Sequence, residues 1–185
     1  MKYLVVALIF IYAGSFAQKS IPNFTLVNSY QGDTISLHHY SAVSAIVIIF
    51  ASNECPYDNY YKQRIAELVE RYSGKIQFLL INSNSTPAES VSQMALHYTD
   101  LKIPYLADKD QKVMALLGAS KSPEAFLLKP EATKFSVQYS GAIDDNPQMA
   151  KDTKQNYLQD AISKLLAGEK IEIRSTRVVG CSISN

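Results

Sequence analysis

The sequence has 185 residues, of which 47% are hydrophobic and 19% are charged. This is enough apolar material for one domain with its own core, and it excludes a disordered chain. There are 18 Lys and Arg against 17 Asp and Glu, and basic residues never cluster in runs longer than a pair. We therefore expect neither nucleic acid nor an anionic membrane surface as the main partner.

The first segment predicts export. Lys2 precedes an apolar run at 3–13, and Ser15 and Ala17 are small residues at the −3 and −1 positions of a cleavage site. The run is shorter than the roughly 20 apolar residues that cross a bilayer. We predict a cleaved signal peptide at 1–17 rather than an uncleaved anchor, no stable membrane span afterwards, and a periplasmic or secreted protein in which disulfides persist.

The next elements follow in chain order. Two short apolar pieces at 21–27 and 34–37 flank a Gly-Asp turn and predict a β-hairpin. The continuous β-branched run at 45–50 predicts a strand buried on both faces. Residues 56–72 have apolar side chains at helical spacing, and 75–82 form a second buried strand.

The later elements continue this alternation: a helix at 87–98, a strand at 103–107, a helix at 108–117, strands at 125–128 and 134–139, a helix at 152–167 and an irregular tail at 169–185. Alternating strands and helices predict an α/β fold with a mixed central sheet flanked by helices, opened by the N-terminal hairpin. We predict a single domain at 18–168, followed by a tail that carries Cys181.

Cys55 lies between the strand at 45–50 and the helix that Pro56 opens. Proline at the first helical position loses no hydrogen bond, so the sulfur is placed beside a helix N-terminus. Free N–H groups and the helix dipole favour an anion there, and the thiolate is the nucleophilic form of cysteine. The alternative is a small buried apolar residue at the end of a strand.

Four segments carry a family resemblance, and they occur in order: FASNECPY at 50–57, INSN at 81–84, GAIDDNP at 141–147 and RVVGCSI at 177–183. Together they resemble the thioredoxin superfamily, in particular its redoxin branch of peroxiredoxin-like, AhpC/TSA-type proteins. The resemblance implies a thioredoxin-like fold with Cys55 at the redox-active position. It also implies that Pro123 is the cis-proline opposite Cys55, whose neighbour lends its backbone to a bound thiol partner.

The residues close to Cys55 in the sequence depart from the pattern of these relatives. No second cysteine stands three residues after Cys55, where the chain has Asp58, or three residues before it, where the chain has Ser52. Ser52 resembles the peroxiredoxin threonine whose hydroxyl helps to position a peroxide, but Ile48 stands where the proline that opens that motif would fall.

Peroxiredoxins also hold the thiolate with an arginine, and this chain has none between Arg71 and Arg174. Arg64, on the helix after Cys55, and Arg174 or Arg177 in the tail are the remaining candidates. We therefore expect thiol–disulfide exchange or slow peroxide reduction rather than fast peroxidase activity.

Cys181 is the only other thiol. Three roles are open for it. Cys181 can resolve an oxidised Cys55, it can form a permanent structural disulfide that contributes roughly 4–5 kcal/mol in the entropic description, or it can pair with another chain. The three histidines, His38, His39 and His97, make a poor ligand set, so we expect no metal and no other cofactor.

The sequence thus predicts an exported thiol-based oxidoreductase with antioxidant activity, in which Cys55 is the nucleophile, Cys181 the possible resolving thiol, and Ser52 and Pro123 complete the site. The expected partner is a thiol or disulfide protein or a hydroperoxide, and the oligomeric state is left open. The alternative is a catalytically silent thioredoxin-fold binding module with a structural Cys55–Cys181 disulfide.

Overall fold

The computed structural model describes residues 19–184. Its main feature is an eight-stranded sheet with the strand order β1-β9-β8-β4-β5-β6-β2-β3. The strands are β1 Ser20–Ile21, β2 Thr25–Asn28, β3 Thr34–Ser36, β4 Ala45–Phe50, β5 Ile76–Asn82, β6 Tyr105–Ala107, β8 Glu124–Pro130 and β9 Phe135–Gly141. Strands β4, β5 and β6 pair in parallel and the other neighbours pair antiparallel, so the predicted mixed α/β sheet is confirmed.

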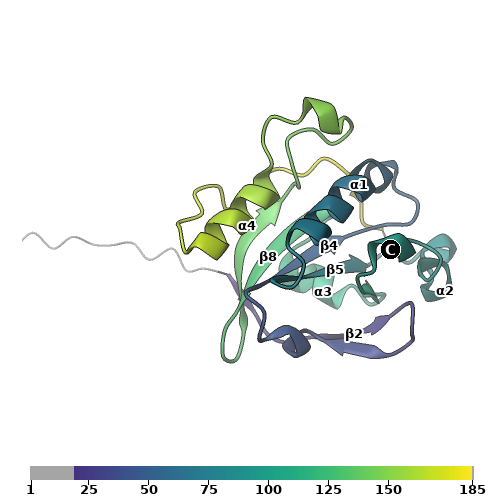
Figure 1. The fold of residues 1–185 in the computed structure, drawn as a ribbon. Helices are drawn as coiled ribbons and strands as arrows, with labels where there is room; N and C mark the ends of the chain where they lie inside the picture. Colours follow the sequence, from purple (N-terminus) through teal and green to yellow (C-terminus); the bar gives the residue numbers. More distant parts are fainter. Residues whose placement is uncertain (1–18, 185) are drawn as a thin grey trace, which may run out of the picture.

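Helices cover both faces of this sheet (Figure 1). All six residues of β4 are buried, because its side chains alternate between two cores. Val47 and Ile49 pack with α1 (Pro56–Arg71) and α4 (Tyr157–Ala167) on one face, whereas Ile48 packs with α3 (Lys112–Leu117) on the other. The uninterrupted apolar run predicted this central position.

The structure corrects several predicted elements. The helix at 87–98 is instead broken into the short turns η2 (Pro87–Glu89), α2 (Val91–Met94) and, further on, η3 (Thr99–Leu101). It breaks at Ser90, whose backbone is extended at φ −59° and ψ 157°.

Two further corrections concern element ends. Ile21 does not belong to the N-terminal hairpin, because it pairs with Phe135 of β9 at the opposite edge of the sheet. The long C-terminal helix begins at Tyr157, after a separate turn, η4 (Ala150–Asp152). His38 and His39 lie in a further turn, η1 (Leu37–Tyr40).

The tail contains a strand that the sequence pattern did not reveal. Strand β10 (Cys181–Ser182) pairs antiparallel with β7 (Lys121–Ser122), which places Cys181 opposite Ser122. In Figure 1 the tail is the yellow segment that leaves α4 and ends at the C-terminus, close to α2. The tail therefore returns to the domain and lies against it.

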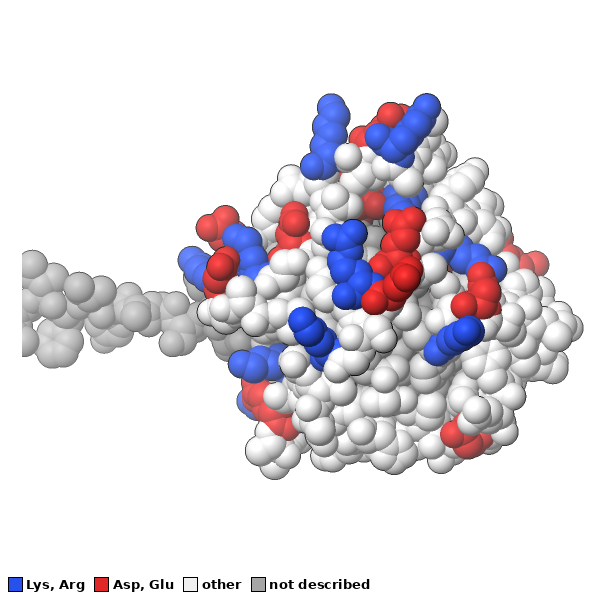
Figure 2. Space-filling model, viewed as in Figure 1, with Lys and Arg blue, Asp and Glu red and all other residues white. Residues whose placement is uncertain are grey.

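Charges are mixed on the face drawn in Figure 2, where Lys and Arg alternate with Asp and Glu. Within residues 19–184, no helix is both long and apolar enough to cross a bilayer. The predicted signal peptide at 1–17 lies outside the described residues.

Candidate active site

Cys55 caps the N-terminus of α1. Its backbone is extended, at φ −76° and ψ 120°, and Pro56 follows at the first helical position, as the sequence predicted. The side chain makes no capping hydrogen bond and is 2% exposed. The sulfur therefore lies at the positive end of a helix dipole, which favours a thiolate when the bridge is open. Its burial acts in the opposite direction and favours the neutral thiol.

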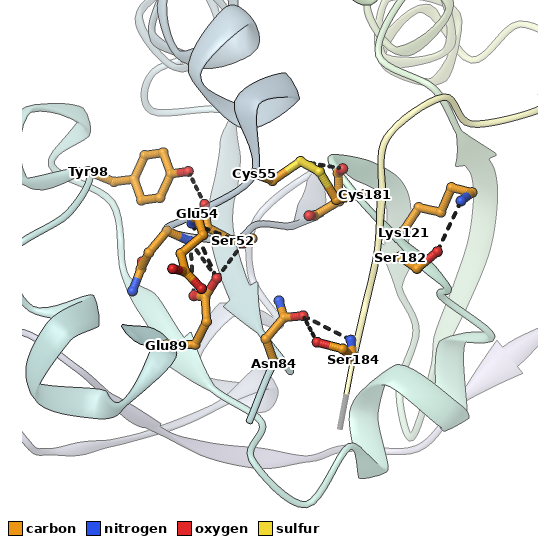
Figure 3. The surroundings of a disulfide bond; sticks show 12 residues. Ser52, Glu54, Cys55, Asn84, Glu89, Tyr98, Lys121, Cys181, Ser182 and Ser184 are labelled. Atoms are coloured by element: carbon orange, nitrogen blue, oxygen red, sulfur yellow. Dashed lines mark hydrogen bonds between the residues drawn. A yellow bond between two sulfur atoms is a disulfide. The ribbon is translucent and has the colours of Figure 1, made fainter. Parts of the chain in front are cut away.

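A disulfide joins Cys55 to Cys181 (Figure 3). The two residues are 126 positions apart, yet their Cα atoms lie 5.9 Å apart, within the range that a disulfide spans. The pairing of β10 with β7 brings the tail cysteine to this place. Of the three possibilities for Cys181, the structure thus shows pairing within the chain.

Ser122 and Pro123 form the wall opposite Cys55. The Ser122–Pro123 peptide bond is cis, as the resemblance implied. The carbonyl oxygen of Ser122 lies 3.5 Å from Cys55 Sγ. In the reduced protein this oxygen can accept a weak hydrogen bond from the thiol.

The tail is held mainly through its backbone. The Ile183 N–H donates to the Ser120 carbonyl at 3.0 Å, and the Ser184 N–H donates to Asn84 Oδ1 at 3.0 Å. Gly180 approaches Ser122 so closely that a Cβ would lie 2.2 Å from the Ser122 carbonyl oxygen. Close backbone approach is the physical reason for glycine here.

Glu89 is a site residue that sequence reasoning missed. Its carboxylate is 2% exposed and accepts hydrogen bonds from the Ser52 hydroxyl and from the Asn53 and Glu54 N–H groups, the last at 3.3 Å. The loop before Cys55 therefore wraps around one buried anion (Figure 3). The sequence did contain one signal for it. Glu89 is an acidic residue shortly after the end of a buried strand, and that strand is the parallel neighbour of the strand that precedes Cys55.

This anion belongs to a larger polar network. Asn82 Nδ2 donates to Glu89 and lies 2.7 Å from the Tyr105 hydroxyl. The Tyr98 hydroxyl donates to the Ser52 carbonyl at 2.7 Å, and burial raises its pKa far above the usual range. Lys109 Nζ donates to Asn82 Oδ1, and desolvation lowers the pKa of this lysine to about 8.

Asp58 is the second missed residue. It lies in the first turn of α1, is 1% exposed, and donates its N–H to the Cys55 carbonyl at 3.1 Å. Desolvation raises its pKa well above the usual range, although the Ser122 hydroxyl and the Ser52 main chain act to lower it. The sequence showed only that this position lacks the second cysteine of a dithiol.

Arg64 binds a loop and not the Cys55 sulfur. Its Nη1 binds Asp144 Oδ2 at 2.6 Å and the Asn146 carbonyl at 2.7 Å, and its guanidinium stacks 3.7 Å above the Tyr61 ring. The side chain holds the loop at 141–147 against α1. The Arg174 Nε donates to the Ile171 carbonyl within the tail.

A small open cavity of about 170 Å³ lies beside the disulfide. Its lining includes both cysteines, Glu54, Asn84 and Thr86. In the part of the chain that the structure describes, no group of three or more His, Cys, Asp or Glu is arranged to hold a metal ion.

The fold and this site define a thioredoxin-like protein in which a disulfide joins a helix N-terminus to a C-terminal tail. The sequence matches the AhpC/TSA family over residues 17–146, which is more than half of the chain. The chain belongs to the AhpC/TSA family, as the sequence motifs implied. No curated protein matches it by sequence.

Solved structures show the same fold. An uncharacterized conserved protein from Geobacillus kaustophilus is 26% identical, with 91% of each chain covered and a TM-score of 0.81. A hypothetical protein from Sinorhizobium meliloti 1021 is also 26% identical, covering 90% of this chain and 92% of its own, with a TM-score of 0.80. A secreted Mycobacterium tuberculosis disulfide oxidoreductase shares the fold at 16% identity and a TM-score of 0.53, covering 78% of this chain and 95% of its own.

Proposed function

We propose that this protein is an exported thiol-based oxidoreductase, with Cys55 as the nucleophile and Cys181 as the resolving thiol. The observation that carries the proposal is the asymmetry of the Cys55–Cys181 bridge. One sulfur is buried at a helix N-terminus, and the other lies on a half-buried tail attached mainly by main-chain hydrogen bonds. Such a bridge can open by movement of the tail alone.

The cycle begins with the reduced protein. The Cys55 thiolate attacks one sulfur of a partner's disulfide and releases the other as a thiolate, or it attacks a hydroperoxide and becomes a sulfenic acid with release of an alcohol or water. The Cys181 thiolate then attacks the Cys55 sulfur. This step forms the intramolecular bridge and releases the partner's remaining thiolate, or hydroxide from the sulfenic acid, which a proton converts to water.

We favour a disulfide-bearing protein over a hydroperoxide as the substrate. The Ser52 hydroxyl donates its hydrogen bond to Glu89, and the Arg64 guanidinium binds Asp144. Neither side chain is therefore oriented to position a peroxide at Cys55. Peroxide reduction is then expected to be slow, and antioxidant activity is secondary. Next to Pro123, the backbone of Ser122 is proposed to receive the partner once the tail leaves.

We assign the proposed signal peptide to residues 1–17, the redox domain to 18–168 and the resolving tail to 169–185. Export agrees with the use of a disulfide at the site. The secreted Mycobacterium tuberculosis oxidoreductase of the same fold supports the same location, the periplasm or the exterior of the cell.

The test is intact-mass measurement of the purified, reduced protein after one equivalent of an oxidised peptide disulfide or of hydrogen peroxide. The wild-type protein should lose two protons and form the bridge. Cys181→Ser should stop at a mixed disulfide or a sulfenic acid on Cys55, and Cys55→Ser should not react.

The alternative, a silent binding module with a permanent bridge, predicts a different result. In that case the folded wild-type protein resists reduction by dithiothreitol, and in Cys181→Ser the Cys55 thiol resists alkylation until the protein unfolds. Either of these results would refute the oxidoreductase.

A further inference from the structure

The C-terminal tail is attached to the domain at two separate places. One is the pairing of 181–184 with β7 and its surroundings, described above. The other lies further back, where the Ser140 N–H donates to the Arg174 carbonyl at 3.0 Å and the Thr176 N–H donates to the Ser140 carbonyl at 3.1 Å. These bonds form a parallel bridge between Ser140 and Ser175. The tail is thus fixed to the end of β9 before it reaches the disulfide.

The hydroxyl of Thr176 closes a ring of hydrogen bonds at this second place. Its oxygen accepts the Ala142 N–H at 2.9 Å and lies 2.6 Å from the Tyr139 hydroxyl oxygen. Tyr139 donates its single hydrogen to the Ala142 carbonyl, so Thr176 is the donor to Tyr139. The Tyr139 side chain is fully buried. A closed ring around a buried phenol holds Thr176 more firmly than an exposed hydrogen bond would.

Close packing reinforces this anchor at Thr176. Gly141 has a φ of 142°, and a Cβ at this position would collide with both the side chain and the backbone of Thr176. Ile171, which precedes the anchor in the tail, is buried in the same core as α4. The first half of the tail, 169–176, is therefore part of the folded domain.

The span between the two attachments is held much less. Within residues 19–184, Arg177, Val178 and Val179 make no hydrogen bond. Arg177 and Val179 line a cavity of about 190 Å³ that extends to Pro123, so this span is not packed closely onto the domain. Backbone with few hydrogen bonds and contacts is the first to open. The chain can therefore bend at 177–179 while the anchor at Thr176 stays closed.

We infer that Thr176 is a positioning residue for Cys181, because it is the pivot of a short arm formed by residues 177–184. This inference rests on the proposed function, and the bonds that form and break are those of the cycle above. Five residues separate the pivot from Cys181, so a fully extended arm carries the released thiol no more than about 18 Å from Thr176. The arm makes room for a partner at β7, yet it keeps Cys181 at a high local concentration for attack on Cys55 of its own chain.

The length of the arm sets the size of the effect. Without the anchor, the next fixed residue back along the tail is Ile171, ten residues before Cys181. The effective concentration of a tethered group falls roughly as the −3/2 power of the tether length. Doubling the arm should therefore lower the effective concentration of Cys181 by about threefold.

The test is the equilibrium between the protein and glutathione, in which intact mass separates the intramolecular bridge from the glutathione adduct of Cys55. Thr176→Val keeps the shape but removes the hydroxyl from the ring, and it should lower the equilibrium constant for the bridge by about threefold or more. Thr176→Ser keeps the hydroxyl and should restore the wild-type constant. Ser175→Ala changes an exposed neighbour and should have no effect.

This constant distinguishes positioning from a contribution to stability alone. A purely structural Thr176 would stabilise the bridged and the reduced protein equally, so its loss would leave the constant unchanged. An unchanged constant in folded Thr176→Val would therefore overturn the pivot.

A second variant leaves Thr176 and its ring intact. Insertion of Gly-Ser-Gly-Ser between Arg177 and Val178 lengthens the arm from five residues to nine, within the span that makes no hydrogen bond in the described part of the chain. The constant for the bridge should fall by about twofold. A constant equal to that of the wild type would show that arm length does not control Cys181, and it would overturn the inference.

Hydrogen exchange locates the hinge. When the wild-type protein is reduced, the amides of 181–184 should lose protection, whereas the Ala142 and Thr176 amides should keep theirs, because both belong to the anchor. Loss of protection at Ala142 and Thr176 together with 181–184 would show that the whole tail leaves, which would overturn the pivot.

The two hypotheses fail in different ways. A wild-type bridge that glutathione neither forms nor opens in the folded protein overturns the oxidoreductase and the arm with it. A bridge that forms and opens normally, with the same constant in Thr176→Val and in the insertion variant, overturns the role of Thr176 alone.

Discussion

The two sulfurs of the bridge have contrasting surroundings. The loop before Cys55 is held by buried side chains around the Glu89 carboxylate, whereas Cys181 lies on a tail that pairs with β7 mainly through its backbone. Buried charge-assisted hydrogen bonds resist opening more than main-chain bonds at a half-exposed edge. The reaction should therefore move the tail and leave the helix end of Cys55 in place.

The largest expected effect comes from removing the link between the two regions. Cys181→Ser should lower the free energy of unfolding by about 4–5 kcal/mol relative to the bridged protein, because the closed loop in the unfolded chain is long. Urea denaturation measures this, and the reduced wild-type protein is the control that should match the variant.

Hydrogen exchange on the same variant tests the contrast directly. Amides of 181–184 should lose protection while those of 52–55 keep it. Equal loss of protection in both segments would contradict a mobile tail against a fixed loop.

The next effect tests the fixed region. Glu89→Gln should cost about 2–3 kcal/mol, since hydrogen bonds to a buried carboxylate are strong and the amide would set one donor against the Ser52, Asn53 or Asn82 donors. The exposed tail acid in Glu172→Gln is the matched control and should change stability by less than about 0.5 kcal/mol. Chemical denaturation of both variants measures these free energies of unfolding. An unchanged Glu89→Gln protein would show that Glu89 does not fix the loop before Cys55.

A third variant tests how the tail approaches its partner strand. Gly180→Ala places a Cβ 2.2 Å from the Ser122 carbonyl oxygen, so β10 must shift away from β7. The equilibrium constant for bridge formation against glutathione should fall by about tenfold, or about 1.4 kcal/mol. Val179→Ala, next to it and 47% exposed, should leave the constant unchanged; an effect of equal size there would show that tail packing in general, rather than close approach, sets the constant.

The smallest effect concerns the end of the tail. Asn84→Ala removes the acceptor for the Ser184 N–H and should weaken bridge formation by about 1 kcal/mol, the value of one ordinary hydrogen bond. The same glutathione equilibrium measures it. Ser182→Ala removes only an exposed contact with Lys121, at 3.4 Å, and should have no effect; if it weakens the bridge as much as Asn84→Ala does, the anchor at Asn84 is not specific.

Much of the fold could be predicted from residue patterns. The apolar runs at 45–50 and 75–82 became β4 and β5, and Pro56 opened α1, because local periodicity and capping act over a few residues. The helix predicted at 87–98 failed because its apolar spacing did not reveal the extended backbone at Ser90. Ile21 joined the other edge of the sheet because strand pairing depends on partners that are distant in the chain.

The site was predictable to a lesser degree. Cys55 followed from its place between a strand and a helix, and the cis bond before Pro123 followed from the family resemblance. Ser52 was identified as a site residue, but its hydroxyl has Glu89 as its partner, 37 residues away. No local pattern shows which acid enters a buried network.

The sequence by itself determined the α/β alternation and one cysteine at a helix N-terminus, since these depend on period and near neighbours. Only the tertiary structure decided that Cys181 meets Cys55, that Glu89 holds the loop, and that Asp58 is buried. The physical reason is that contacts between residues far apart in the chain depend on how strands and tail pack together, and this packing has no short-range signature.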